Sequence, residues 1–154
     1  MLSTGTTAPD FELVNQHRQN VRLSDFRGQK HVVVAFHPLA FTPVCATQMS
    51  GYESNLPQIE GSDAVVLGIS IDPQPSKTAW AKTLGPISFD LLSDFHPHGE
   101  VAQKYGVFRP VEGFSERAVF VVGKDGLVKW SKTYDIPQQP DNGELLAALD
   151  SLDP

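Results

Sequence analysis

Residues 31–71 read HVVVAFHPLAFTPVCATQMSGYESNLPQIEGSDAVVLGISI, and this stretch decides the fold. Residues 31–36 and 64–71 are continuous apolar runs rich in β-branched side chains, which are typical of strands buried on both faces. Between them, from Pro43 onward, apolar residues recur every three to five positions, which predicts an amphipathic helix whose last turn is bent or loosened by Pro57. Strand, helix and strand in this order form a βαβ unit, so the two strands are expected to be parallel.

Shorter elements are expected on both sides of this unit. Upstream, apolar and polar residues alternate over 11–13 and 21–23, which predicts two strands joined by the polar loop 15–20. Downstream, turn residues and apolar periodicity predict a helix over 73–84 with Ser76 as its N-cap, a strand over 88–94, a helix over 98–106 closed by Gly106, strands over 117–122 and 127–134 joined by a tight turn at Asp125-Gly126, and a helix over 142–149.

These elements predict an α/β protein with a central mixed β-sheet flanked by helices, an arrangement that resembles the thioredoxin-like fold. The chain has 154 residues and shows no internal repeat, low-complexity tract or linker, so one domain over residues 1–154 is expected. A fold of this kind hosts many functions. Function therefore has to be argued from the site.

Composition and charge limit the cellular compartment and the classes of binding partner that are expected. The formal net charge of −6 argues against nucleic acid or an anionic membrane as partner, because both require a positive surface. The beginning of the chain lacks the pattern of a signal peptide, and the apolar runs are too short to span a bilayer. The single cysteine excludes a disulfide within the chain. We therefore expect a cytoplasmic protein with no membrane or nucleic-acid partner.

The single cysteine, Cys45, lies where a helix is expected to begin. Thr42 is a favoured N-cap residue whose hydroxyl is expected to accept from a helix N–H, and Pro43 suits the first helical position. Cys45 then lies in the first turn, where free N–H groups and the positive end of the helix dipole favour a thiolate. The alternative is that Cys45 is an inert core residue.

Residues 38–45, PLAFTPVC, have the pattern Pro-x-x-x-Thr-x-x-Cys, which resembles the peroxidatic motif of the peroxiredoxins. The resemblance continues in the order of that family through APDFEL, DFRGQKHVVVAFHP, LLSDFHPHGEVAQKYGV and ERAVFVVGKDG. Without a second cysteine, the chain most resembles the one-cysteine group of alkyl hydroperoxide reductase E.

The resemblance implies a role for each matching residue. Cys45 would be the nucleophile that attacks a peroxide and becomes a sulfenic acid. Thr42 would place its hydroxyl near the thiolate and the peroxide, and Pro38 would cover the site. Arg117 would stabilise the thiolate and the charge on the breaking O–O bond. The backbone N–H groups of Val44 and Cys45 would complete the substrate site.

Structural alternatives exist for three of these residues. Thr42 is equally suited to be a helix cap, and Pro38 to end a strand. Arg117 could instead form a surface salt bridge, since Glu112 and Glu116 are close in sequence, although it begins an apolar strand where a surface arginine is less expected.

The chain departs from the family pattern at two positions near the motif. Gln48 replaces an acid found in many relatives, which either favours the thiolate further or leaves Arg117 less well held. His37 replaces an aromatic residue, and we interpret it as filling a packing position rather than as a proton donor. On that interpretation, a His37→Phe variant keeps its pH–rate profile. His96 and His98 lack a third clustered ligand, so we expect no metal, and no other cofactor either.

The sequence therefore predicts a thiol-dependent peroxidase that reduces hydrogen peroxide, organic hydroperoxides or peroxynitrite. Its sulfenic acid would be reduced by an external thiol, namely a low-molecular-weight thiol or a glutaredoxin, mycoredoxin or thioredoxin. A homodimer or higher oligomer is expected from the resemblance, with Phe41, Phe108 or Phe114 at its interface. Two alternatives are a redox-silent binding or chaperone module, and a peroxide sensor that oxidises a partner protein.

Overall fold

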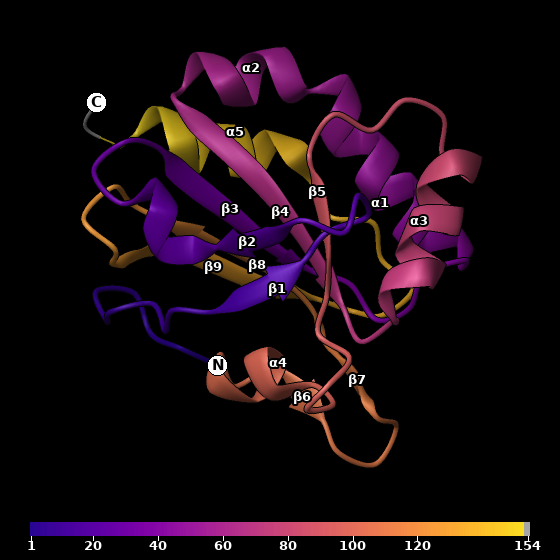
Figure 1. The fold of residues 1–154 in the computed structure, drawn as a ribbon. Coiled ribbons are helices and arrows are strands. Elements are labelled where there is room, and N and C mark those ends of the chain that lie inside the picture. The colour runs from indigo at the N-terminus through magenta and orange to yellow at the C-terminus, as the bar shows by residue number, and fades with distance from the viewer. Residues whose placement is uncertain (153–154) are drawn as a thin grey trace.

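The computed structural model describes residues 1–152. At its centre lies a β-sheet (Figure 1). The strands of this part of the chain are β1 Glu12–Val14, β2 Asn20–Arg22, β3 His31–Phe36, β4 Ala64–Ser70, β5 Asp90–Ser93, β6 Phe108–Arg109, β7 Phe114–Ser115, β8 Arg117–Val122 and β9 Val128–Tyr134. Seven of them form one sheet in the order β2-β1-β5-β4-β3-β8-β9, and β6 pairs with β7 separately.

Helices cover both faces of this sheet. The helices are α1 Pro43–Ser54, α2 Leu56–Gly61, α3 Gln74–Thr83, α4 Glu100–Lys104 and α5 Asn142–Asp150, with a 3-10 helix η1 at Leu23–Phe26. In Figure 1, α1, α2 and α5 lie on one side of the sheet and α4 on the other. The βαβ unit expected from residues 31–71 is confirmed, because β3 and β4 pair in parallel from His31↔Ala64 to Phe36↔Ile69.

The sheet is mixed, as predicted, and its central strands are buried on both faces. β5 extends the parallel pairing of β4, whereas β8 lies antiparallel to β3 on its other side. Alternate residues of β3 enter opposite cores. Val33 and Ala35 pack with α1, α2 and α5, while Val32, Val34 and Phe36 pack with α4. This alternation explains why the strand is apolar at every position.

Two expectations about helix ends are wrong. The segment after Pro43 forms two helices, with α1 ending at Ser54 and Pro57 in the first turn of α2, where a proline sacrifices no helix hydrogen bond. Ser76 is not an N-cap, because α3 begins at Gln74 and Ser76 already donates its N–H to Pro73 O at 3.0 Å.

Other boundaries differ by a few residues. Leu23 belongs to η1 rather than to a strand, the helix expected over 98–106 is shortened to α4, and the β6–β7 hairpin was not predicted. Gly106, with φ of 71°, follows α4 as expected, and Gly126, with φ of 82°, turns the chain between β8 and β9. Both positions need the left-handed backbone that glycine adopts without strain.

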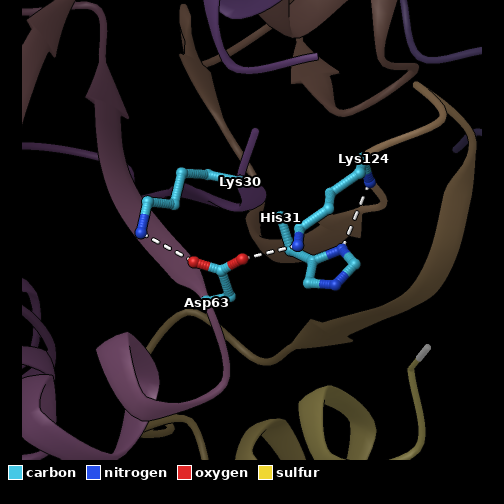
Figure 2. Close-up of polar contacts among 4 residues, drawn as sticks. All are labelled: Lys30, His31, Asp63 and Lys124. Carbon is cyan, nitrogen blue, oxygen red and sulfur yellow. Dashed lines mark hydrogen bonds and ion pairs between the residues drawn. The ribbon is translucent and has the colours of Figure 1, made fainter. Parts of the chain in front are cut away.

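An ion cluster ties three chain segments together at the beginning of β3 and β4 (Figure 2). Asp63 accepts from Lys30 Nζ at 2.7 Å through one carboxylate oxygen and from Lys124 Nζ through the other. The backbone N–H of Lys124 donates to His31 Nδ1 at 3.2 Å. The β8–β9 turn is therefore joined to the parallel pair by side chains as well as by the sheet. Hydrogen bonds from Lys124 and Lys30 lower the pKa of Asp63 from 3.8 to about 2.

We expect this cluster to make stability depend on pH in the acid range. Because the folded pKa of Asp63 is depressed, its ion pairs stabilise the protein above about pH 4, and this contribution is lost as the pH falls towards about 2. An Asp63→Asn variant should have a lower urea midpoint than the wild type at pH 6, and this difference should shrink steadily as the pH falls towards about 2. The exposed Asp25→Asn serves as control. A constant difference across this range would contradict the prediction.

Candidate active site

The loop from residue 37 to residue 42 lies at the carboxyl ends of β3 and β4 and leads into α1. Asp72, which follows β4, accepts from the backbone N–H of Ala40 at 2.8 Å and from Ser70 Oγ at 2.6 Å. Phe41 has a left-handed backbone with φ of 64°, and its side chain is 57% exposed. The parallel pair thus positions the loop by a carboxylate that both segments share.

Thr42 occupies the N-cap position of α1 but does not cap the helix with its side chain. Its hydroxyl donates to Leu39 O at 2.7 Å, and no side-chain cap hydrogen bond forms. The expectation that this hydroxyl accepts from a helix N–H is therefore wrong. The N–H groups of Val44 and Cys45 are not taken by the Thr42 side chain.

Cys45 is the third residue of α1 and is completely buried. It belongs to an apolar cluster that includes Ala40, Met49 and Trp80. Such burial would also suit an inert core thiol. A charged group distinguishes the two cases, because the Arg117 guanidinium reaches the sulfur, with Nη1 3.3 Å from Cys45 Sγ.

Arg117 is the first residue of β8, and all three nitrogens of its guanidinium donate hydrogen bonds. Nε and Nη2 donate to Ile136 O at 3.0 and 2.8 Å, and Nη1 donates to Gln48 Oε1 at 2.7 Å as well as to Cys45 Sγ. Only 2% of the residue is exposed. Because a guanidinium keeps its proton at any physiological pH, a permanent positive charge lies against the sulfur.

The alternative of a surface salt bridge for Arg117 is wrong. Glu112 and Glu116 pair instead with Arg109, at 3.0 and 3.8 Å. The arginine that begins an apolar strand therefore turns inward, and the one in the β6–β7 hairpin remains at the surface.

Gln48 holds Arg117 without adding a charge. It is buried one turn after Cys45, and while its Oε1 accepts from Arg117, its Nε2 donates to Tyr52 Oη at 3.1 Å. Burial raises the pKa of Tyr52 above its ordinary value, so this hydroxyl stays neutral. Glutamine therefore still holds Arg117, through a neutral hydrogen bond of 2.7 Å.

We predict that Gln48→Glu disfavours the thiolate. The new carboxylate would face Arg117 Nη1 beside the sulfur, and a like charge opposes ionisation of a neighbouring group. The pH at which half of Cys45 is ionised should rise by roughly one unit. The ultraviolet absorbance of the thiolate measures this directly, because the chain has one cysteine. Gln58→Glu, an exposed change on α2, is the control, and an equal midpoint in both variants would contradict the prediction.

A cavity of about 180 Å³ lies beside Arg117 and the residues that precede Cys45 in α1. Its lining is mostly apolar and comes from the loop after β3, the first turn of α1, β7, β8 and the segment after β9: Pro38, Leu39, Thr42, Pro43, Val44, Phe114, Arg117, Ile136 and Pro137. Four of the five residues singled out from the sequence therefore line this cavity, namely Pro38, Thr42, Val44 and Arg117. Arg117 joins the cavity wall to the fifth, Cys45.

His37 is completely buried, and its ring stacks on Trp80 with a centroid separation of 5.1 Å. Its Nε2 lies 2.8 Å from the Nζ of Lys77, a fully buried residue of α3. Burial, with the charges of Lys77 and Arg117, holds the pKa of His37 well below 6.5. Burial lowers the pKa of Lys77 to about 7, against opposing effects of Asp72 and Cys45.

Two groups of the site, Lys77 and the carbonyl of Ile136, have no signal in the sequence that points to them. A lysine in a polar helical segment is normally exposed, and a backbone acceptor has no residue signature. His98, by contrast, contacts Gly113 O at 2.7 Å and lies in an exposed loop. Over residues 1–152, no three His, Cys, Asp or Glu side chains gather as the ligands of a metal ion would.

Comparisons with known proteins show which family the chain resembles. The model of the AhpC/TSA family matches residues 4–131. Alkyl hydroperoxide reductase E of Mycobacterium tuberculosis is 43% identical over 132 residues, which cover 86% of each chain. The chloroplastic 2-Cys peroxiredoxin BAS1 of Arabidopsis thaliana is 33% identical over 157 residues, which cover 96% of this chain and 58% of that protein.

Solved structures give the same result for the fold. The crystal structure of peroxidoxin BcpB from Mycobacterium tuberculosis superposes with a TM-score of 0.87 at 28% identity and covers both chains completely, at 100% each. The reduced 2-Cys peroxiredoxin of Plasmodium vivax gives a TM-score of 0.89 at 27% identity, over 98% of this chain and 82% of that chain. The thioredoxin-like α/β fold expected from the sequence is confirmed. None of the helices within residues 1–152 has the length and apolar character needed to cross a membrane.

Proposed function

This chain belongs to the AhpC/TSA family, the peroxiredoxins, and we propose that Cys45 is the nucleophile of its thiol-dependent peroxidase activity. Family membership establishes the reaction class, in which a hydroperoxide is reduced at the expense of a thiol. The observation that carries the assignment of Cys45 is the 3.3 Å contact between its sulfur and Nη1 of Arg117, a residue that also lines the cavity.

In the proposed reaction, the Cys45 thiolate attacks the terminal oxygen of a hydroperoxide. An S–O bond forms, the O–O bond breaks, and the released oxygen takes a proton from solvent to leave as an alcohol or as water. The sulfur is oxidised by two electrons to a sulfenic acid. Negative charge moves from sulfur to the departing oxygen, so a fixed cation that faces both atoms lowers the barrier. We assign this role to Arg117.

Three further groups support substrate binding. The Thr42 hydroxyl donates its hydrogen bond to Leu39 O, so its oxygen lone pairs remain free to accept from the O–H of a hydroperoxide. The N–H groups of Val44 and Cys45, in the first turn of α1, are suited to polarise the oxygen under attack. Pro38 presents a buried apolar surface without an N–H and keeps water from the sulfur.

The lining of the cavity favours hydroperoxides with an apolar group. Val44, Phe114, Ile136 and Pro137 offer carbon surface to an alkyl chain, whereas hydrogen peroxide would use the polar groups alone. We therefore propose organic hydroperoxides as preferred substrates, with hydrogen peroxide and peroxynitrite also reduced.

The sulfenic acid has no second cysteine in this chain to resolve it. We propose that an external thiol condenses with it, releasing water and forming a mixed disulfide, and that a second thiol then restores Cys45. The donor would be a low-molecular-weight thiol or a glutaredoxin, mycoredoxin or thioredoxin of the cytoplasm. We further propose a homodimer with Phe41, Phe108 or Phe114 at its interface, which a monomer in sedimentation at micromolar concentration would contradict.

Single-turnover oxidation tests the function. The reduced protein is mixed with one equivalent of cumene hydroperoxide or hydrogen peroxide, tryptophan fluorescence is followed by stopped flow, and the product is weighed by mass spectrometry. We expect one fast phase and the addition of one oxygen atom, faster with the organic peroxide. Oxidation no faster than that of free cysteine would reject the proposal.

A further inference from the structure

Two titratable side chains beside the site take no part in the proposed reaction, although both are completely buried. Lys77 on α3 and His37 after β3 contact one another through Nζ and Nε2 at 2.8 Å, and Trp80 contacts both. A lysine is rarely buried without a carboxylate partner. Within residues 1–152, however, Lys77 forms no ion pair with an acid. Such a costly arrangement calls for a role.

We propose that Lys77 and His37 form a proton-holding pair that controls the ionisation of Cys45, with Lys77 supplying a positive charge that can be gained and lost. The proposal rests on the proposed function in taking Cys45 as the reactive thiol. The cavity is lined by other residues, so Lys77 and His37 are positioning residues that act through the field at the sulfur.

The charges around the pair determine where its proton resides. Lys77 faces Asp72 after β4 and Cys45 on α1, and the negative charge of either favours the protonated amine. His37 faces the positive charges of Lys77 and of Arg117 on β8, which together with burial disfavour an imidazolium. The proton therefore belongs to Lys77, whose pKa of about 7 lets it titrate near neutral pH.

The coupling between Lys77 and Cys45 acts in both directions. If the thiolate favours protonation of Lys77, a protonated Lys77 favours the thiolate by the same free energy. Lys77 and Cys45 are both completely buried, so little solvent screens the two charges from each other. The fixed charge of Arg117 and the variable charge of Lys77 would thus act on one sulfur.

The hydrogen bond between Lys77 and His37 couples the protonation state of Lys77 to the tautomer of His37. A protonated Lys77 donates to the Nε2 lone pair, which places the imidazole proton on Nδ1. A neutral amine can instead accept from Nε2–H. Nδ1 is buried, and no hydrogen-bond partner for it is found in the described part of the chain, so no other contact fixes the tautomer.

Two measurements test the proposal without depending on peroxidase activity. The nitrogen and carbon chemical shifts of labelled His37 should report an Nδ1–H tautomer at pH 6 and an Nε2–H tautomer at pH 8.5. Titration of the thiolate absorbance should show a midpoint that rises by roughly half a unit in Lys77→Gln, which means about threefold less thiolate below the midpoint. Glutamine keeps a hydrogen bond to His37 and removes only the charge.

Lys82→Gln, an exposed change on the same helix, is the matched control and should keep the wild-type midpoint. His37→Phe should also shift the midpoint, since Lys77 loses its acceptor, whereas the packing interpretation of His37 expects no change. A single histidine tautomer across this pH range would overturn the proposal, as would a wild-type midpoint in a folded Lys77→Gln. Because neither readout uses peroxide, an inactive but coupled protein would reject the proposed function alone.

Discussion

Replacing Cys45 by serine is expected to abolish peroxide reduction, with a loss of at least roughly 10³-fold in the second-order rate constant. A serine hydroxyl stays protonated at neutral pH and, unlike sulfur, cannot be oxidised to an acid by the peroxide. The measurement is peroxide consumption with an excess of thiol, together with the mass of the protein after exposure.

The fold should survive this change, because a serine Oγ can still accept from Arg117 Nη1 in place of the sulfur. Thermal unfolding of the variant followed by circular dichroism is therefore the control. A folded Cys45→Ser protein that consumes peroxide at the wild-type rate would show that another group carries the reaction.

Arg117→Gln is expected to slow peroxide reduction by roughly 10²- to 10³-fold. The change removes the only charge that contacts the sulfur among the described residues, and with it the stabilisation of both the thiolate and the departing oxygen. The rate constant of Arg117→Lys should lie between those of the wild type and of Arg117→Gln. An ammonium keeps the charge but cannot reach Ile136 O, Gln48 and the sulfur at once.

Arg109, the half-buried surface arginine of the β6–β7 hairpin, provides the matched control. Arg109→Gln removes an equal charge together with its ion pairs to Glu112 and Glu116, and it should leave the rate constant within about twofold. Rates are compared at a temperature where circular dichroism shows each variant to be folded, because Arg117 also satisfies buried acceptors. Equal losses at positions 117 and 109 would indicate a long-range charge effect rather than a contact with the sulfur.

Several features of this protein could be predicted from local sequence. The β-branched runs before and after α1 produced the parallel pair, because a continuous apolar run satisfies a strand with a core on each side. Glycine at positions 106 and 126 marked a helix end and a turn, where the backbone is left-handed. The motif from Pro38 to Cys45 indicated the cavity wall, since residues so close in sequence lie together in any fold that starts a helix there.

Hydrogen-bond partners were harder to predict, since a side chain has more than one use for its polar atoms. Thr42 has the right residue type for a helix cap, yet its hydroxyl donates to the carbonyl of Leu39, three residues earlier. Ser76 is not a cap either, because α3 begins two residues before it, at Gln74. The resemblance already linked Arg117 to Cys45 and to Gln48, but it gave no sign of the Ile136 carbonyl, because a backbone acceptor in the loop after β9 has no residue signature.

The sequence by itself determined the βαβ core, the position of the single thiol in the first turn of a helix, and the family, because these depend on residues near one another in the chain. Tertiary structure alone decided that Arg117 contacts Cys45, 72 residues away, and that Lys77 is buried against His37, 40 residues away. Burial is a property of the packed sheet and helices rather than of any short segment. The resemblance already pointed to the charge of Arg117, but the buried charge of Lys77 became visible only when β3 and α3 were brought together.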